Sequence, residues 1–111
     1  MRVTMVSGSG TAIAGSRLAP FVTEVFAGQV LVGLIAVPIL VPVAGLTYLV
    51  LMRNTSAGGQ NIRFGGAPSF IGLTGFLLAP NDVVTLDFWG PIVNAIADAA
   101  GGTLEVGIWS T

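Results

Sequence analysis

The side chains that could carry out acid–base, nucleophilic or metal chemistry are scarce in this 111-residue chain. It contains no histidine, cysteine or lysine, so the commonest general base, the thiolate nucleophile, the Schiff-base amine and the usual zinc ligands are all missing. The charged residues are Arg2, Arg17, Arg53, Arg63, Glu24, Asp82, Asp87, Asp98 and Glu105. A hydrolase with paired carboxylates is formally possible, but no spacing among these acids favours it. The sequence predicts a protein that is not an enzyme and that uses no cofactor.

The polar motifs indicate neither a metal site nor a phosphate-binding loop. Asp82 and Asp87 lack the cluster of oxygen donors that calcium requires, and Asp82 is expected to cap a turn instead. The paired glycines at 58–59 and 65–66 do not fit the phosphate-binding pattern, which needs a following lysine and helix, so hairpin turns are expected there. A net charge of −1 without a basic stripe argues against nucleic-acid binding.

The balance of apolar and charged residues implies that other molecules cover part of the surface. Fifty-three per cent of the residues are hydrophobic and 8% are charged, against roughly 25% charged in an ordinary soluble domain. The length suits a single domain, expected at residues 21–111. Residues 1–20 are small and polar and lack the apolar stretch of a signal peptide. We expect them to form an extended arm that is either flexible or ordered on a neighbouring subunit.

The uncharged stretch at residues 30–52 raises the alternative of a small membrane protein. Its 23 residues are enough for a helix that spans the hydrocarbon. However, Pro38 and Pro42 lie near its middle, and Gly33 and Gly45 weaken a helix further. Both of its ends have the composition of strands, and apolar segments recur as far as the C-terminus. Strands are therefore favoured over a spanning helix, and a membrane partner is not expected.

Short apolar segments separated by turns predict an all-β fold, either a β-sandwich or a jelly roll of about seven to eight antiparallel strands. Strands are expected at residues 21–26, 30–37, 46–53, 61–65, 83–89 and 103–109, with 92–97 either a strand or a helical turn. Turns are expected at 27–29, 78–82 and 98–102, and a hairpin loop at 54–60. The proline-bounded segment 38–42 cannot lie inside a ladder, so it is expected at a sheet edge or a crossover.

Two of these segments alternate clearly between their two faces. In 83–89, Val84, Leu86 and Phe88 share a wholly apolar face. In 103–109, the apolar residues at 104, 106 and 108 share one face and Glu105 points the other way. One face of each strand is therefore expected in the core.

A series of turn motifs follows residue 46. It comprises Arg53-Asn54 at a strand end, a Gly-rich turn, IRFGG (62–66), a turn ending in LAPND (78–82), VTLD (84–87), WGP (89–91), NAIAD (94–98) and AGG (100–102). Over residues 46–109 this order resembles a group of small β-sandwich virion proteins of tailed bacteriophages. Asn81 stands where the pattern of that group usually has glycine, a difference that the turn tolerates.

The resemblance implies a capsid decoration protein of the cement or staple type. Such a protein would bind the outer face of the major capsid protein, bridge neighbouring capsomers, and act as a dimer or trimer. It would assemble in the host cytoplasm and reside on the capsid surface. A tail or head-fibre attachment module of the same fold, and a membrane protein spanning at 30–52, are the alternatives.

The expected contact surfaces are the proline-bounded segment, the N-terminal arm and the tryptophans near strand ends. A tryptophan contributes a large contact area at low entropic cost, which makes it a frequent anchor of protein interfaces. The predicted interface residues are Pro38, Ile39, Leu40, Val41, Pro42, Trp89, Trp109 and Arg17.

Overall fold

The described part of the chain is all-β. The computed structural model describes residues 21–66 and 75–111, together with the backbone of residues 2–6. These residues form nine strands and no helix: β1 (Arg2–Val6), β2 (Thr23–Val32), β3 (Val37–Leu40), β4 (Tyr48–Asn54), β5 (Ile62–Gly65), β6 (Phe76–Leu78), β7 (Val83–Trp89), β8 (Val93–Ala97) and β9 (Gly102–Ser110).

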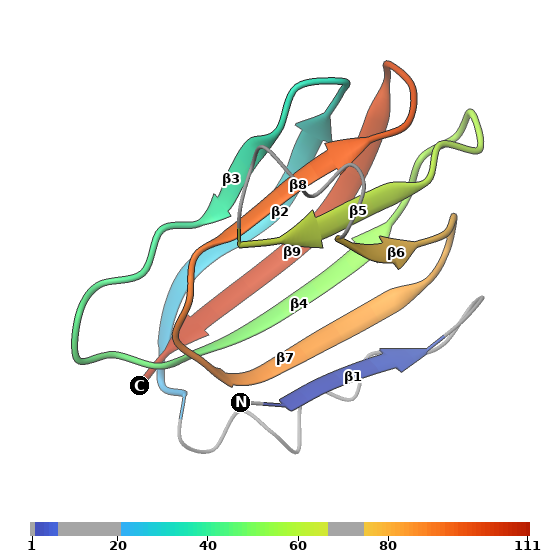
Figure 1. The fold of residues 1–111 in the computed structure, drawn as a ribbon. Coiled ribbons are helices and arrows are strands. Elements are labelled where there is room, and N and C mark those ends of the chain that lie inside the picture. Colours follow the sequence, from blue (N-terminus) through green and yellow to red (C-terminus); the bar gives the residue numbers. More distant parts are fainter. Residues whose placement is uncertain (1, 7–20, 67–74) are drawn as a thin grey trace.

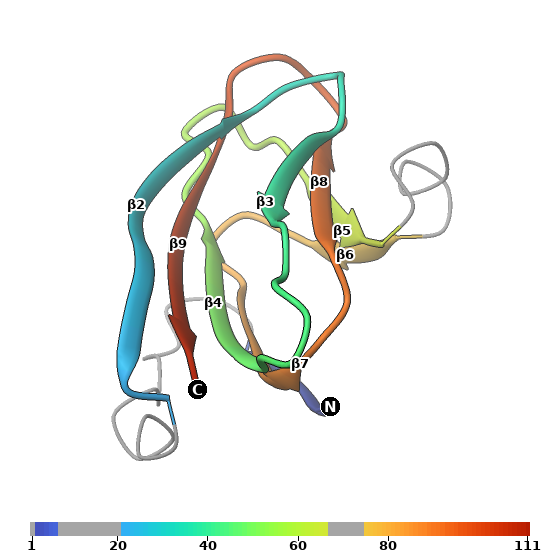
Figure 2. The same cartoon turned by 90° about the vertical axis from the view of Figure 1, so that its left-hand side faces the viewer.

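The strands form two antiparallel sheets that pack face to face (Figures 1 and 2). The five-stranded sheet has the order β1-β7-β4-β9-β2, and the four-stranded sheet has the order β3-β8-β5-β6. The pairing is nested, because β2 pairs with β9, β3 with β8, β4 with β7, and β5 with β6. This is the pairing order of a jelly roll, in which a long antiparallel ribbon is folded over itself. The predicted fold class is confirmed.

The first strand belongs to the sequence region that was expected to form an arm. The backbone of β1 pairs with β7 along its whole length, from Arg2 opposite Asp87 to Val6 opposite Val83. The rest of the predicted arm, residues 7–20 with Arg17, lies outside the described residues.

Strand β2 differs from the prediction in its length. The turn expected at residues 27–29 is absent, because β2 runs through these residues and keeps its register with β9 from Phe26 to Val32. The chain turns instead at residues 33–36, inside the segment predicted as a strand at 30–37. Gly28 does not break the strand, since the pairing with β9 outweighs the weak intrinsic preference of glycine.

The uncharged stretch at residues 30–52 forms strands, as the sequence favoured. It contains the end of β2, all of β3 and the first part of β4. In the described parts of the chain, no helix has the length and apolar character needed to cross a membrane. The proline-bounded segment lies at a sheet edge, as expected, because β3 is the terminal strand of its sheet and contains Pro38.

The core lies between the two sheets, where alternate side chains of each strand meet. The apolar residues at 104, 106 and 108 of β9 are buried and Glu105 is exposed, so the predicted alternation of this strand is confirmed. The buried cluster comprises Val32, Leu40, Tyr48, Val50, Met52, Ile62, Phe64, Leu78, Val84, Leu86, Val93, Ala95, Ala97, Leu104, Val106 and Ile108.

Strand β7 departs from the predicted alternation in two ways. Val83, Thr85 and Asp87 on its second face are buried too, and its end turns outward. Val84 and Leu86 are buried as expected, but Phe88 is 50% exposed. The register between β4 and β7 shifts between Tyr48 and Val50, and Phe88 has a φ of 50°, a left-handed conformation that is unusual for a bulky residue. The shift turns the Phe88 ring out of the core and against the buried ring of Phe21, at 5.0 Å between centroids.

The connection at residues 54–60 joins the two sheets and is not the predicted hairpin loop, because β4 and β5 belong to different sheets. Asn54 is fully buried at its start. The Asn54 Nδ2 donates to the carbonyl oxygens of Gln60 and Leu78, both at 2.8 Å, and its Oδ1 accepts the Ser56 N–H at 3.0 Å. A single amide therefore fixes the crossover and ties β4 to the end of β6 in the opposite sheet.

The turn at residues 79–82 is held by the backbone of the same asparagine. The Asn54 N–H donates to the Asp82 carbonyl, and the Asn54 carbonyl accepts the Asn81 N–H at 2.7 Å. Asn81 has a φ of 69°, a left-handed conformation in which asparagine is tolerated better than most residues other than glycine. The Asp82 Oδ2 accepts the Ala79 N–H at 3.1 Å, which confirms the predicted capping role.

We expect Asn54→Ala to lower the free energy of unfolding by about 2–4 kcal/mol, because buried carbonyls and an N–H lose their partner. Asn61→Ala is the matched control, since the Asn61 side chain bonds to Asp98 at the surface, and we expect it to cost less than about 1 kcal/mol. Urea unfolding followed by tryptophan fluorescence measures both values. Equal losses in the two variants would contradict the role assigned to Asn54.

Candidate interaction surface

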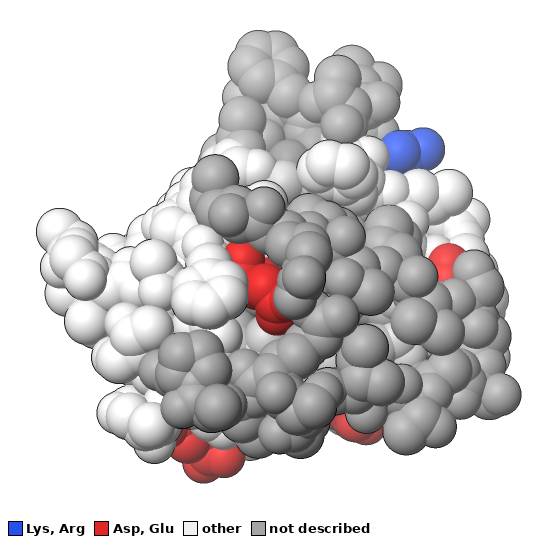
Figure 3. All heavy atoms as spheres, turned by 90° about the horizontal axis from the view of Figure 1, so that it is seen from below, with Lys and Arg blue, Asp and Glu red and all other residues white. Residues whose placement is uncertain are grey.

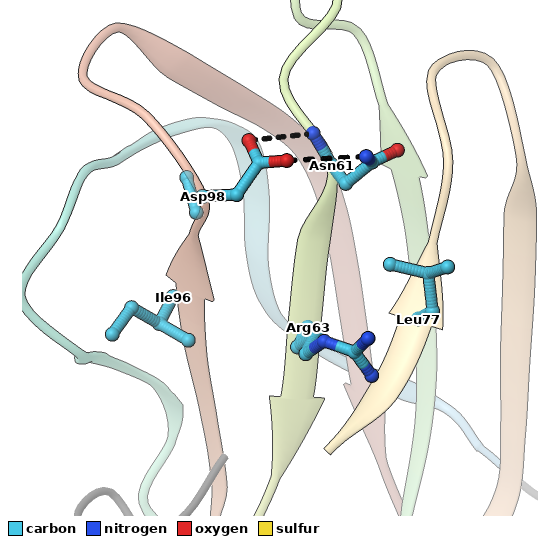
Figure 4. Close-up of a pocket in the computed structure, with 6 residues that line it drawn as sticks. Asn61, Arg63, Leu77, Ile96 and Asp98 are labelled. Atoms are coloured by element: carbon cyan, nitrogen blue, oxygen red, sulfur yellow. Dashed lines mark hydrogen bonds between the residues drawn. The ribbon is translucent and has the colours of Figure 1, made fainter. Parts of the chain in front are cut away.

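A pocket of about 330 Å³ lies on the four-stranded sheet, lined by Asn61, Arg63, Leu77, Ile96, Ala97 and Asp98 (Figure 4). Its polar groups are engaged within the chain. The Asp98 carboxylate accepts the Asn61 N–H and the Asn61 Nδ2, each at 3.1 Å, and the Arg63 Nη1 donates to the Gly75 carbonyl at 2.9 Å. The pocket therefore offers one arginine and one carboxylate, both with structural partners, and no general base beside a nucleophile.

The charged groups do not gather into a binding site elsewhere in the described residues. No group of three or more acids there could hold a metal ion. In the view from below, the acidic atoms of described residues appear as separate small groups (Figure 3). Among the described residues, the charged side chains therefore indicate no particular chemistry.

The most unusual surface feature is a concentration of exposed apolar side chains. In the described part of the chain, nine of the thirteen exposed large hydrophobic residues lie between residues 22 and 46, and we call these nine the apolar surface. They are Val22, Val25, Phe26, Leu31, Leu34, Ile35, Val41, Val43 and Leu46. Single exposed apolar residues are normal, but a contiguous group of them marks an interaction site.

The topology explains why the apolar surface lies where it does. β2 and β3 are the edge strands of their respective sheets, and the turn at residues 33–36 joins them. β2, β3 and the connection that follows β3 all face the viewer in Figure 2. The first seven residues of β2 are all exposed, since the shorter four-stranded sheet does not cover them. The apolar surface therefore occupies one open side of the sandwich.

The region that carries the apolar surface has almost no charge. Residues 21–52 carry a single charge, Glu24. The most exposed side chains are Ile35 at 81% and Val22 at 79%. Burial of such side chains against another protein removes apolar area from water at about 25 cal/mol per Å², with few charges to desolvate.

The structure separates the predicted interface residues of the proline-bounded segment by burial. Pro38 is exposed and Val41 is 68% exposed, so both belong to the open side of the sandwich. Ile39 and Pro42 are half-buried, and Ile39 packs against the core. Leu40 is only 3% exposed, because it lies opposite Val93 of β8 and points between the sheets.

The two predicted tryptophans lie in different environments. Trp89 packs against the core at the end of β7, and its buried Nε1 has no hydrogen-bond acceptor among the described residues. Trp109 is half-buried and covers Gly107, where an added Cβ would lie 2.7 Å from the indole ring. Trp109 is the next residue after the buried Ile108 in β9, and successive side chains of a strand point to opposite faces. The Trp109 side chain therefore lies on the outer face of the five-stranded sheet. Arg17 lies outside the described residues.

The prediction from sequence missed most of the apolar surface. The exposed residues of β2 and the pair Leu34-Ile35 lie in segments predicted as strands and were not among the predicted interface residues. The sequence signal that could have located them is the stretch of residues 21–52, which carries a single charge. An edge strand with so few charges lacks the usual protection against pairing with another chain.

No protein family matches this chain, and neither a curated protein nor a solved structure matches it. The functional argument therefore rests on the fold and on the apolar surface.

We expect Leu40→Ala to lower the free energy of unfolding by about 2–4 kcal/mol, because it leaves a cavity in the core. The neighbouring Val41→Ala should change this free energy by less than about 0.5 kcal/mol, because Val41 is on the surface. Thermal or urea unfolding of the isolated chain distinguishes the two variants. A large loss in Val41→Ala would show that this residue packs within the chain and is not available to a partner.

Proposed function

We propose that this chain is a structural protein of a virus particle that decorates a capsid by docking through the apolar surface. The observation that carries the proposal is the concentration of nine exposed apolar side chains on one side of a sandwich whose residues 21–52 carry one charge. A free monomer gains nothing from exposing this area, whereas an assembled shell covers it. The partner in this proposal is the major capsid protein.

The part of the apolar surface that follows β2 is the proposed capsid contact. Leu34 and Ile35 occupy the turn between the two edge strands, and Val41 and Val43 lie in the connection between β3 and β4. These two segments lie at opposite ends of β3 (Figure 1), so the proposed contact runs along the edge that β3 forms. Docking by burial needs an interface of about 1,600 Å² in total and no catalytic group.

Two further features support a virion role by analogy. The nested strand pairing is that of a jelly roll, an architecture used by many viral capsid domains. The turn motifs from residue 46 onward resemble those of small virion proteins. Folds host many functions, so these two features add support and the apolar surface remains the main argument.

A tail or head-fibre attachment module is the second candidate, because the same surface could bind at a unique position of a virus particle. Copy number separates the two functions. A decoration protein occupies symmetry-related sites over the whole shell and is present in hundreds of copies, whereas a tail part is present in few.

The test of the proposed function is the location and copy number of the chain in virus particles from cells that carry its gene. Quantitative mass spectrometry of gradient-purified particles should give the chain in an amount comparable to the major capsid protein. A few copies per particle would support the tail module and reject decoration. The absence of the chain from particles would reject both.

A rebinding experiment then tests the contact surface. Purified chain should co-sediment with particles that lack it, and Ile35→Asp should reduce binding by roughly a hundredfold, because it buries an unpaired charge at the interface. Leu77→Asp is the matched control, since Leu77 is exposed on β6 and lies outside the apolar surface. Equal binding of the wild-type and Ile35→Asp chains would exclude this contact.

A further inference from the structure

The four edge strands of the described sheets differ in how well they are protected from pairing with another chain. β6 has three residues, β3 has four and contains Pro38, and β1 has five and begins with Arg2. β2 has ten residues and contains neither proline nor a cation. Short length, proline and basic residues are the usual means by which proteins block edge-to-edge pairing. Among these four edges, β2 is therefore the one suited to accept another strand.

The pairing of β2 leaves one side of its backbone available. Its only neighbour in the described sheets is β9, and its register with β9 is regular from Phe26 to Val32. A bulge lies earlier in the strand, between Glu24 and Phe26. The regular part thus presents a row of N–H and C=O groups along its outer edge.

We propose that the outer edge of β2 pairs with β2 of a second copy of this chain, antiparallel and across a two-fold axis at Gly28. The pairing joins two five-stranded sheets into one continuous ten-stranded sheet. The inference does not depend on the proposed capsid function, because the capsid contact uses residues 34–46 and this contact uses the strand before them.

The register centred on Gly28 places apolar side chains opposite each other. In the regular part, Phe26 lies opposite the half-buried Val30 of the second copy. Leu31 lies opposite Val25, the residue at the bulge, and each pair occurs twice by symmetry. Val25 is 51% exposed, Phe26 39% and Leu31 75% in the single chain. At the centre, Gly28 faces itself and Ala27 faces Gln29, so small residues allow the backbones to approach.

The position of the single charge selects the antiparallel arrangement and a second copy as occupant. Glu24 is the only charged residue of β2 and lies near its start. In an antiparallel pair about Gly28, the two Glu24 residues lie at opposite ends of the interface, roughly 27 Å apart at about 3.4 Å per residue. In a parallel, in-register pair they would lie side by side and repel. The contact requires no cation on the partner strand. A second copy meets this condition, because its β2 contains no cation either.

The test uses sedimentation equilibrium of the purified full chain. The wild type should be a dimer, and Leu31→Lys should raise the dissociation constant roughly tenfold or more, because two unpaired cations then face apolar partners. Leu77→Lys on β6 is the matched control and should leave the constant unchanged. The double variant Val25→Lys with Leu31→Glu should recover the dimer, because each lysine then faces a glutamate of the second copy.

Cysteine cross-linking tests the register, since the natural chain contains no cysteine. In the proposed pair the two Gly28 Cα atoms lie about 4.5–5.5 Å apart, within the range for a disulfide. Gly28→Cys should therefore form a covalent dimer under mild oxidation, and Gln29→Cys should do so much more slowly. The added Cβ at Gly28 lies 3.3 Å from the Phe26 ring, which a small movement of that side chain can relieve.

Three results would overturn the proposal. A monomer at all concentrations would exclude a second copy as the occupant of β2, and a trimer would exclude the two-fold axis. A dimer that keeps its affinity in Leu31→Lys would place the contact elsewhere. Faster cross-linking of Gln29→Cys than of Gly28→Cys would exclude the register centred on Gly28.

Discussion

The buried amide of Asn54 is the interaction on which the arrangement of the two sheets depends. A sandwich is held mainly by apolar contact, which is not directional and does not by itself fix how the connections at its ends are placed. Asn54 supplies the directional part, because its side chain and backbone bond to the 54–60 crossover, the end of β6 and the 79–82 turn. A buried polar group of this kind is stabilising only when all its hydrogen bonds are made.

The same end of the molecule is reinforced by further polar contacts. Thr55 and Ser56 bond to Thr103, and the Gln60 Nε2 donates to the Ala100 carbonyl at 2.8 Å. These bonds join the start of the 54–60 crossover to β9 and its end to the turn before β9. This polar end of the sandwich is therefore fixed by hydrogen bonds, whereas the open side formed by β2 and β3 carries many exposed apolar side chains.

The unequal size of the two sheets connects the fold with the proposed roles. The four-stranded sheet covers the middle of its partner and leaves most of β2 without a covering layer. The chain has few charges with which to solvate that strand, and an apolar sheet edge of this kind is suited to pairing with another chain. In the proposed assembly, a second copy covers β2 and a capsid covers the segment that follows it. Two different contacts would thus share one side of the molecule.

The sequence by itself determined the fold class, most strand positions and the shortage of catalytic groups. These follow from local patterns: alternation in β9, prolines that confine β3 to an edge, and turn residues at 79–82 whose backbone requirements are local. The tertiary structure alone decided that the 54–60 connection crosses between sheets, that β2 is one long strand, and that Phe88 faces outward. It also decided that Leu40 is buried while Val41 is exposed. Each of these features depends on pairing between residues that are distant in sequence. The sequence pattern of an apolar residue in a strand is the same whether or not another strand covers it.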